Sequence, residues 1–220
     1  LNNRLFLRTR EQLKRKRVSI INQIKLLLLQ FNIKEFKTGL RFSDLEKINS
    51  MPIAEEVKMN IQVQFKVLEL ITNQISYLED QTISKIKEDK RKIYNLLLSV
   101  PGMGKITAAT LLWEIGDWNR FDNKKKIAAY LGLTPSEYSS GENIKRGRIT
   151  GQGNPQIRSL LIECAWILIR KDPAMELVFK RLMTQTKNKK KAIVAIARRL
   201  IMRSHAMIIR DENYQIGLVF

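Results

Sequence analysis

The chain has 220 residues, of which 44% are hydrophobic and 28% charged, so it can bury a hydrophobic core without disulfide bonds or a structural metal ion to stabilise it. It carries 40 lysines and arginines against 21 aspartates and glutamates, which gives a net charge of +19. Such a charge repels other copies of the chain and attracts polyanions from a distance. Disorder throughout and a disulfide scaffold are therefore excluded, and nucleic acid is the default partner.

The single cysteine, Cys164, and the single histidine, His205, exclude an intramolecular disulfide and a zinc-finger ligand set. The apolar runs, such as residues 26–29, fall far short of the roughly 18 residues that a membrane-spanning helix requires. We therefore expect a cytoplasmic protein with no membrane contact. Because the sequence begins at Leu1 within a charged, helix-like stretch, we also expect a piece of a longer protein.

Two long amphipathic helices are predicted in the first 90 residues. The first apolar stripe comprises Leu13, Ile20, Ile24, Leu27 and Phe31, and the second comprises Val57, Ile61, Leu68, Ile71, Ile75 and Leu78. These spacings predict an antiparallel coiled-coil hairpin with a loop around residues 36–42, and two helices inside an ordinary bundle remain the alternative. We assign residues 1–90 to this coiled-coil and dimerisation region, through which the chain would form a homo-oligomer.

Residues 91–220 are predicted to form a compact helical domain. The expected helices span residues 92–100, 105–115, 123–131, 154–171, 174–185 and 189–210. Asn154 followed by Pro155 is a strong helix-start signal, because a capping side chain precedes a proline at the first helical position. The glycines between residues 132 and 153 break any helix, so this stretch is predicted to be an exposed loop or β-hairpin.

A Pro-Gly-Met-Gly-Lys turn at residues 101–105 stands between two predicted helices and is typical of a helix-hairpin-helix element. In such an element, Gly102 and Gly104 let the backbone approach a phosphate, and Lys105 and Thr107 add donors at the start of the next helix. These contacts would not read nucleic-acid sequence. The alternative is a tight helix-helix corner without a ligand.

Two adjacent serines, Ser139 and Ser140, lie on the glycine-broken stretch and are followed by Arg146, Arg148 and Arg158. A serine hydroxyl can attack a phosphodiester, and arginines can neutralise the charge that builds on the phosphoryl group. By composition alone a polar loop explains the same residues, and Tyr138 is a rival nucleophile.

A strongly basic stretch follows towards the end of the chain, with no acidic residue between Arg181 and His205. Its basic residues are Lys187, Lys189, Lys190, Lys191, Arg198, Arg199 and Arg203. The predicted helix could lie along a nucleic-acid backbone, or its basic face could simply be solvated while the opposite face packs inward.

Several motifs follow one another in the second half of the sequence: residues 100–104, Ala108-Ala109, Phe121, residues 128–135, Ser139-Ser140-Gly141, residues 146–150, Gly153-Asn154, Arg158 and Leu160-Leu161. In this order they resemble the C-terminal transposase domain of the insertion-sequence one-hundred-ten family. They cover about half of the chain, and the preceding basic helices resemble the coiled-coil region of the same family.

The resemblance implies a DNA transposase whose chemistry is like that of serine recombinases. A serine would attack the DNA backbone to give a covalent phosphoserine intermediate, and in many members a guide RNA directs the reaction. The nucleophile falls on Ser139-Ser140-Gly141, where we favour Ser140 and keep Ser139 as the alternative. Arg146, Arg148 and Arg158 are expected to hold phosphates, an inference from charge and proximity.

In this family, an acidic magnesium site belongs to a separate N-terminal nuclease domain. The acidic residues in the first half of this sequence are scattered along predicted helices, so no metal ligands and no cofactor are assigned within it. Magnesium is expected in the missing nuclease domain. We therefore expect this chain alone to bind nucleic acid and associate with itself, but not to cut or rejoin DNA. A non-catalytic binding and oligomerisation module is the alternative.

Overall fold

A computed structural model describes residues 2–36, 39–140 and 143–218, and their side chains except those of residues 2–3 and 136–148. It divides the chain into two compact units, Leu1–Lys85 and Ile86–Phe220, which are described separately. The predicted mainly helical class is confirmed. The predicted boundary lay near Lys90, whereas the structure divides the chain in the short segment after α3.

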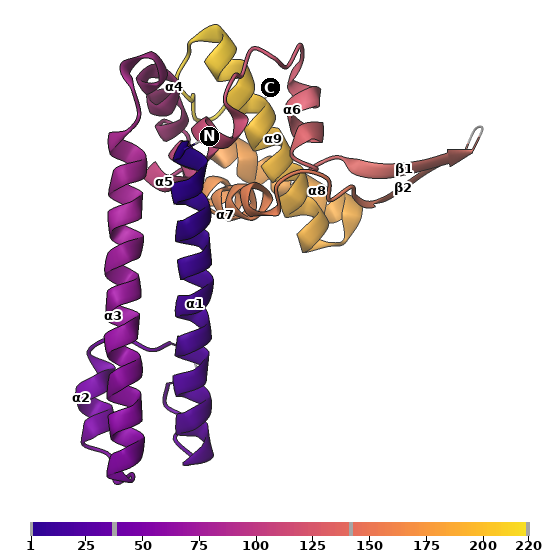
Figure 1. Ribbon diagram of the computed structural model, residues 1–220. Coiled ribbons are helices and arrows are strands. Elements are labelled where there is room, and N and C mark those ends of the chain that lie inside the picture. Colours follow the sequence, from indigo (N-terminus) through magenta and orange to yellow (C-terminus); the bar gives the residue numbers. More distant parts are fainter. Residues whose placement is uncertain (1, 37–38, 141–142, 219–220) are drawn as a thin grey trace. The chain divides into compact units, whose positions relative to one another are not determined.

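The first unit is a helical hairpin made of α1 (Asn2–Gln30) and α3 (Glu55–Ser84), which run side by side in opposite directions (Figure 1). A short helix, α2 (Asp44–Asn49), packs against α3. The core cluster of this unit is formed by Ile24, Leu28, Phe36, Ile48, Ile61, Phe65 and Leu68. Residues from the expected loop thus contribute to the core, because α2 folds back over the hairpin.

The apolar stripe predicted for the first helix is wrong at its last residue, Phe31. Helix α1 ends at Gln30, so Phe31 leaves the helical register, and its side chain is 44% exposed. Leu28 takes a core position beside Ile24 instead. The two helices are also joined by a polar contact, since Arg10 Nε donates to Glu79 Oε1 at 2.6 Å.

The second unit contains the remaining elements. They are α4 (Glu88–Leu98), α5 (Lys105–Ile115), α6 (Lys124–Tyr130), β1 (Pro135–Ser140), β2 (Asn143–Ile149), α7 (Pro155–Lys171), α8 (Pro173–Thr186) and α9 (Lys189–Arg210). Helix α9 contacts α4, α6, α7 and α8 and is therefore the central helix. The largest difference from the predicted bounds is the start of α4, at Glu88 rather than Lys92.

Side-chain caps set where four of these helices begin, and Asn123 Oδ1 caps α6 by accepting from Lys125 N at 2.9 Å. Asn154 Oδ1 accepts from Gln156 N at 2.9 Å, and Asp172 Oδ1 accepts from Ala174 N at 3.0 Å, each just before a proline. Asn188 Oδ1 accepts from Lys191 N and starts α9. The start predicted at Asn154-Pro155 is confirmed, because the cap satisfies an amide that the first helical turn leaves unpaired.

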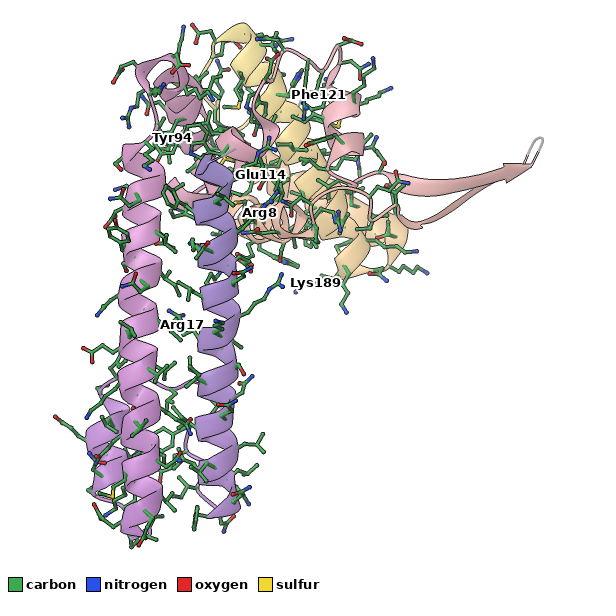
Figure 2. All side chains as sticks on the ribbon, viewed as in Figure 1. Arg8, Arg17, Tyr94, Glu114, Phe121 and Lys189 are labelled. Atoms are coloured by element: carbon green, nitrogen blue, oxygen red, sulfur yellow. The ribbon has the colours of Figure 1, made fainter. Side chains whose placement is uncertain are left out.

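The lone histidine is a core residue. His205 is 5% exposed, and its Nε2 lies 3.2 Å from the carbonyl oxygen of Trp118. Its ring also packs edge-on against Phe121, the residue labelled in the second unit in Figure 2. These contacts give His205 a packing role in the second unit.

Candidate nucleic-acid interface

The turn between α4 and α5 packs tightly against α7. Gly102 has φ +91°, and a Cβ at this position would lie 2.8 Å from Ile167 Cβ and 2.9 Å from the Cys164 carbonyl oxygen. The glycine is therefore required both by the backbone conformation and by the close approach of α7. This is a packing reason for Gly102, whereas Gly104 is exposed and a Cβ there would meet nothing within 4 Å.

The first turn of α5 presents one of its two predicted donors to solvent. Lys105 is exposed beside Gly104, where the free N–H groups of the helix start are also found. Thr107 is half-buried, and its hydroxyl hydrogen-bonds the Cys164 thiol. Burial raises the pKa of Cys164 to about 11, so this thiol is unreactive at neutral pH. An anion can thus reach Gly104 and Lys105 here.

The predicted glycine-broken stretch forms a β-hairpin. Strands β1 and β2 pair antiparallel, with Glu137 opposite Arg146, Ser139 opposite Ile144 and Ser140 opposite Asn143. The two serines therefore occupy the last described pairs of the hairpin. Figure 1 shows the hairpin projecting from the rest of the second unit.

Part of the predicted serine site lies outside what the structure describes. Gly141 is outside the described residues altogether, and the side chains of Tyr138, Ser139, Ser140, Arg146 and Arg148 are outside the described side chains. For the five residues with undescribed side chains, the structure gives the backbone alone.

The base of the hairpin is held by two glycines and one arginine. A Cβ on Gly132 (φ +66°) would lie 1.7 Å from the Gln152 carbonyl oxygen, and one on Gly153 (φ +88°) would lie 2.3 Å from the Tyr130 carbonyl oxygen. Arg158 Nη1 donates to the carbonyl oxygens of Gln152 at 3.0 Å and Gly153 at 3.1 Å. Segments 130–133 and 150–153 therefore cross in direct contact, with the Arg158 guanidinium fastening them.

The predicted serine and arginine residues are spread along the hairpin. With about 3.4 Å of rise per residue, the strand from Pro135 to Ser140 carries the serine roughly 17 Å from the hairpin base. Arg158 lies at that base, and Arg146 is paired three positions away from Ser140. In Figure 1 the hairpin also points away from α4 and α5. A single copy therefore does not bring Arg158, Lys105 and the serines together.

A buried polar cluster in the second unit escaped the sequence analysis. Tyr214 Oη donates to Asp172 Oδ2, and Arg203 Nη1 donates to Tyr214 Oη at 2.7 Å. Arg203 also donates to the carbonyl oxygens of Gln215 and Leu218, and Gly217 N donates to Asp172 Oδ1 at 3.1 Å. The cluster fixes residues 214–218 onto α8 and α9. In the sequence, only the pair Asp172-Pro173 points to this region, and it indicates a helix cap rather than a buried ion pair.

The described residues contain neither a membrane-spanning helix nor a cluster of metal ligands. None of the helices in those ranges is long and apolar enough to cross a membrane. The described histidine, cysteine and acidic residues also form no group of three or more that could hold a metal ion.

Comparison with known proteins relates the second unit to a transposase family. Residues 94–180 match the sequence model of the Transposase IS116/IS110/IS902 family. This region includes the α4–α5 turn, the whole hairpin, Arg158 and α7. The match supports a transposase of this family.

Individual relatives extend the similarity over most of the chain. The putative transposase y4rJ of Sinorhizobium fredii is 29% identical over 215 residues, which cover 89% of this chain and 54% of the relative. The transposase for insertion sequence element IS1111A of Coxiella burnetii is 27% identical over 96% of this chain and 59% of its own length. A pilin gene-inverting protein of Moraxella bovis is 39% identical over 54% of this chain and 38% of its own length. The chain thus spans little more than half the length of the first two relatives.

Proposed function

We propose that this chain is the nucleic-acid-binding and serine-bearing part of a DNA transposase that cleaves and rejoins strands during DNA transposition. The observation that carries the proposal is the coincidence of a transposase-family match over residues 94–180 with a projecting hairpin that has adjacent serines in its last pairs. Relatives named as transposases and as a pilin gene-inverting protein support the same class of reaction.

In the proposed chemistry, Ser140 Oγ attacks a backbone phosphorus, with Ser139 as the alternative nucleophile. A serine–phosphate bond forms, the phosphodiester bond to the leaving strand breaks, and the hydroxyl of that strand departs. Reversal with another strand end rejoins the DNA and frees the serine. A serine at the end of a projecting hairpin can reach a bound duplex, or a neighbouring subunit, without movement of the helical body.

Several copies of the chain are expected to build one reaction site. The hairpin carries the serines about 17 Å from Arg158, so phosphate-neutralising groups beside the reacting phosphate must come from Arg146, Arg148 or another chain. A second copy of the chain would then complete the site. Gly104, Lys105 and the α5 start would hold a more distant part of the backbone without reading its sequence.

The outer face of α3 supports association of copies through the helical hairpin. Val63, Leu70 and Tyr77 follow one another at seven-residue intervals and are 60%, 60% and 57% exposed. Ile61 and Leu68, which pack into the core of the first unit, lie on a different face of the same helix. A repeated apolar stripe of this kind is what a further coiled-coil partner covers.

We extend the proposal to a guide RNA and to an external metal site. The net charge of +19 suits the binding of RNA as well as DNA, because both present a phosphate backbone. The described residues contain no ligand set for the magnesium that the family resemblance implies. No step assigned to this chain therefore uses a metal.

The test uses the whole transposase containing this chain, with magnesium, guide RNA and DNA that carries the element ends. A denaturing gel followed by mass spectrometry should reveal a protein–DNA adduct on Ser140, and Ser140→Ala should abolish it while DNA binding persists. An adduct on Ser139 would move the nucleophile by one residue. Retained binding with no adduct in the wild type would leave the chain a non-catalytic binding and assembly module.

A further inference from the structure

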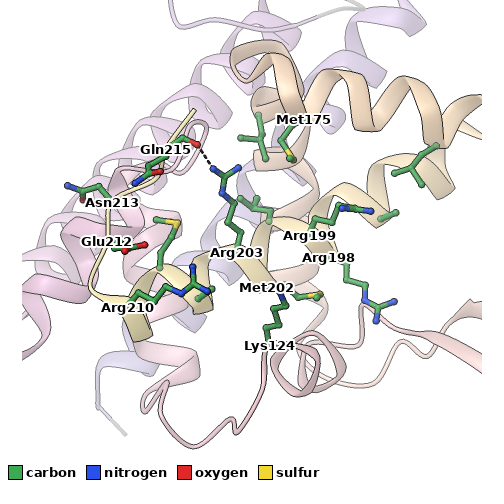
Figure 3. A pocket seen from close by; sticks show the side chains of 16 residues that line it. Lys124, Met175, Arg198, Arg199, Met202, Arg203, Arg210, Glu212, Asn213 and Gln215 are labelled. Carbon is green, nitrogen blue, oxygen red and sulfur yellow. Dashed lines mark hydrogen bonds between the residues drawn. The ribbon is translucent and has the colours of Figure 1, made fainter. Parts of the chain in front are cut away.

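Helix α9 and the segment that follows it enclose a pocket of about 530 Å³ that is separate from the hairpin (Figure 3). Arg199, Arg203, Ala206 and Arg210 are spaced by three or four residues, so they lie on one face of the helix. The short side chain of Ala206 leaves room between the arginines. The opposite wall is formed by Glu212, Asn213 and Gln215.

The pocket carries an excess of positive charge. Lys124, Arg198, Arg199, Arg203 and Arg210 line it against one acidic residue, Glu212. Arg203 is already compensated by Asp172, but no described acidic side chain forms an ion pair with Arg198 or Arg199. Arg198 Nε is also buried without a hydrogen-bond partner among the described atoms. Cations gathered in a partly enclosed site repel one another, and an anion entering the pocket would relieve that repulsion.

The wall of the pocket is fixed in place before any ligand binds. Residues 214–218 are tied to Asp172 and Arg203 by the buried cluster, and Tyr214 N donates to Ser99 Oγ at 2.9 Å. Glu212 N donates to the Met207 carbonyl oxygen at 3.0 Å. A wall that is already ordered lowers the entropic cost of binding.

The size and lining of the pocket indicate a ligand larger than a bare phosphate. A volume of about 530 Å³ lies within the ~300–1,000 Å³ of ordinary small-molecule sites. Leu168, Met175 and Met202 contribute apolar surface beside the guanidinium groups, which suits a sugar and base attached to a phosphate. Duplex DNA keeps its bases stacked inside, whereas an unpaired nucleotide can turn its base into a pocket.

We propose that this pocket receives one nucleotide of an unpaired DNA or RNA strand, with its phosphate on Arg198 and Arg199 and its base towards Met175 and Met202. The proposal rests on the proposed function, since strand exchange and guide pairing both require unpaired strands. Arg203 is a positioning residue here, because it orders the wall opposite the two free guanidinium groups.

The test measures fluorescence anisotropy of the 220-residue chain with labelled 12-nucleotide single strands of DNA and RNA and with the matching DNA duplex. The double variant Arg198→Ala, Arg199→Ala removes two charges inside the pocket, and the control Lys190→Ala, Lys191→Ala removes two charges from the same helix outside it. We expect the pocket variant to weaken single-strand binding at least about tenfold more than the control, with equal effects of both variants on the duplex. A stronger loss with DNA than with RNA, or the reverse, identifies which strand occupies the pocket.

A second variant keeps the charges and fills the space. Ala206→Leu should also reduce single-strand affinity while duplex affinity stays at the wild-type value, and circular dichroism checks that each variant is folded. Equal losses for pocket and control variants on both kinds of DNA would overturn the pocket and leave general electrostatic binding. A wild-type chain that binds neither single strands nor duplex would instead overturn the proposed function itself.

Discussion

Asp172 is predicted to be the residue on which the order of the C-terminal segment depends. Its carboxylate is 1% exposed, accepts hydrogen bonds from Tyr214 Oη, Ala174 N and Gly217 N, and lies 3.5 Å from Arg203 Nη1. Asp172→Asn keeps the size of the side chain but removes the charge, and it turns one acceptor into a donor. Arg203 would then be a buried cation without its counter-ion.

The expected magnitude follows from these contacts. Loss of one partner of a buried ion pair costs about 3–5 kcal/mol. Arg203 retains Tyr214 Oη and two carbonyl oxygens, so the lower end applies, and we expect the free energy of unfolding to fall by about 3 kcal/mol. Against the ~5–15 kcal/mol of an ordinary domain this is a large loss.

Urea unfolding measures this effect, with tryptophan fluorescence as the signal, because Trp113, Trp118 and Trp166 all belong to the second unit. With a typical slope of about 2 kcal/mol per molar urea, the midpoint should drop by roughly 1.5 M. Asp211→Asn is the matched control: its ion pair with Lys92 is exposed, and we expect a change below about 0.5 kcal/mol. A midpoint for Asp172→Asn within about 0.3 M of the wild type would refute the assigned role.

Three further predictions concern the second unit. In urea unfolding, Gly132→Ala should destabilise this unit by at least about 2 kcal/mol more than Gly151→Ala. Both glycines have positive φ, but of the two only Gly132 would bring its Cβ against backbone atoms. Equal losses of unfolding free energy would contradict this. Arg158→Ala should speed amide hydrogen exchange in residues 131–134 and 150–154 by about tenfold or more, because it removes a charged donor from their carbonyl groups. Unchanged exchange rates would contradict the role of Arg158 in holding the hairpin base. Burial raises the pKa of Cys164 to about 11 in the folded protein, whereas the unfolded chain loses this proton from about pH 9. The free energy of unfolding should therefore fall by up to roughly 3 kcal/mol as the pH rises from about 9 to 11. Cys164→Ala should lack this part of the fall, and identical pH profiles of the two proteins would refute the prediction.

The local signals were sufficient for the helices and for part of the candidate site. Helix periodicity, with caps such as Asn154 before Pro155, placed the helices of the second unit to within a few residues. Glycines between residues 132 and 153 predicted a loop or hairpin, and the structure has a hairpin. The motifs from residue 100 to Leu161 indicated the family that the comparisons support. These features depend on neighbouring residues or on motif order, so the sequence alone carries them.

The roles of individual glycines and arginines depended on tertiary contacts. Gly102 resembled a phosphate-binding glycine, yet its closest neighbours are Ile167 and Cys164 on α7. Arg158 was predicted to hold a phosphate, and this stays a prediction; the structure adds that its Nη1 donates to carbonyl groups at the hairpin base. The residues of α7 that contact Gly102 are distant from it in sequence, and Arg158 Nη1 also lies 3.4 Å from the carbonyl oxygen of Leu131, 27 residues away. Helix periodicity encodes neither contact.

The basic residues of α9 also show, within a single helix, the difference between what the sequence encodes and what tertiary contacts decide. Composition and charge by themselves determined a helical, strongly cationic protein suited to nucleic acid. They did not distinguish Arg203, which is buried against Asp172, from Arg198 and Arg199, which line a pocket without acidic partners. Only the folded chain brings Tyr214 to Asp172, 42 residues away, and so decides which charges are neutralised internally and which remain for an anionic ligand.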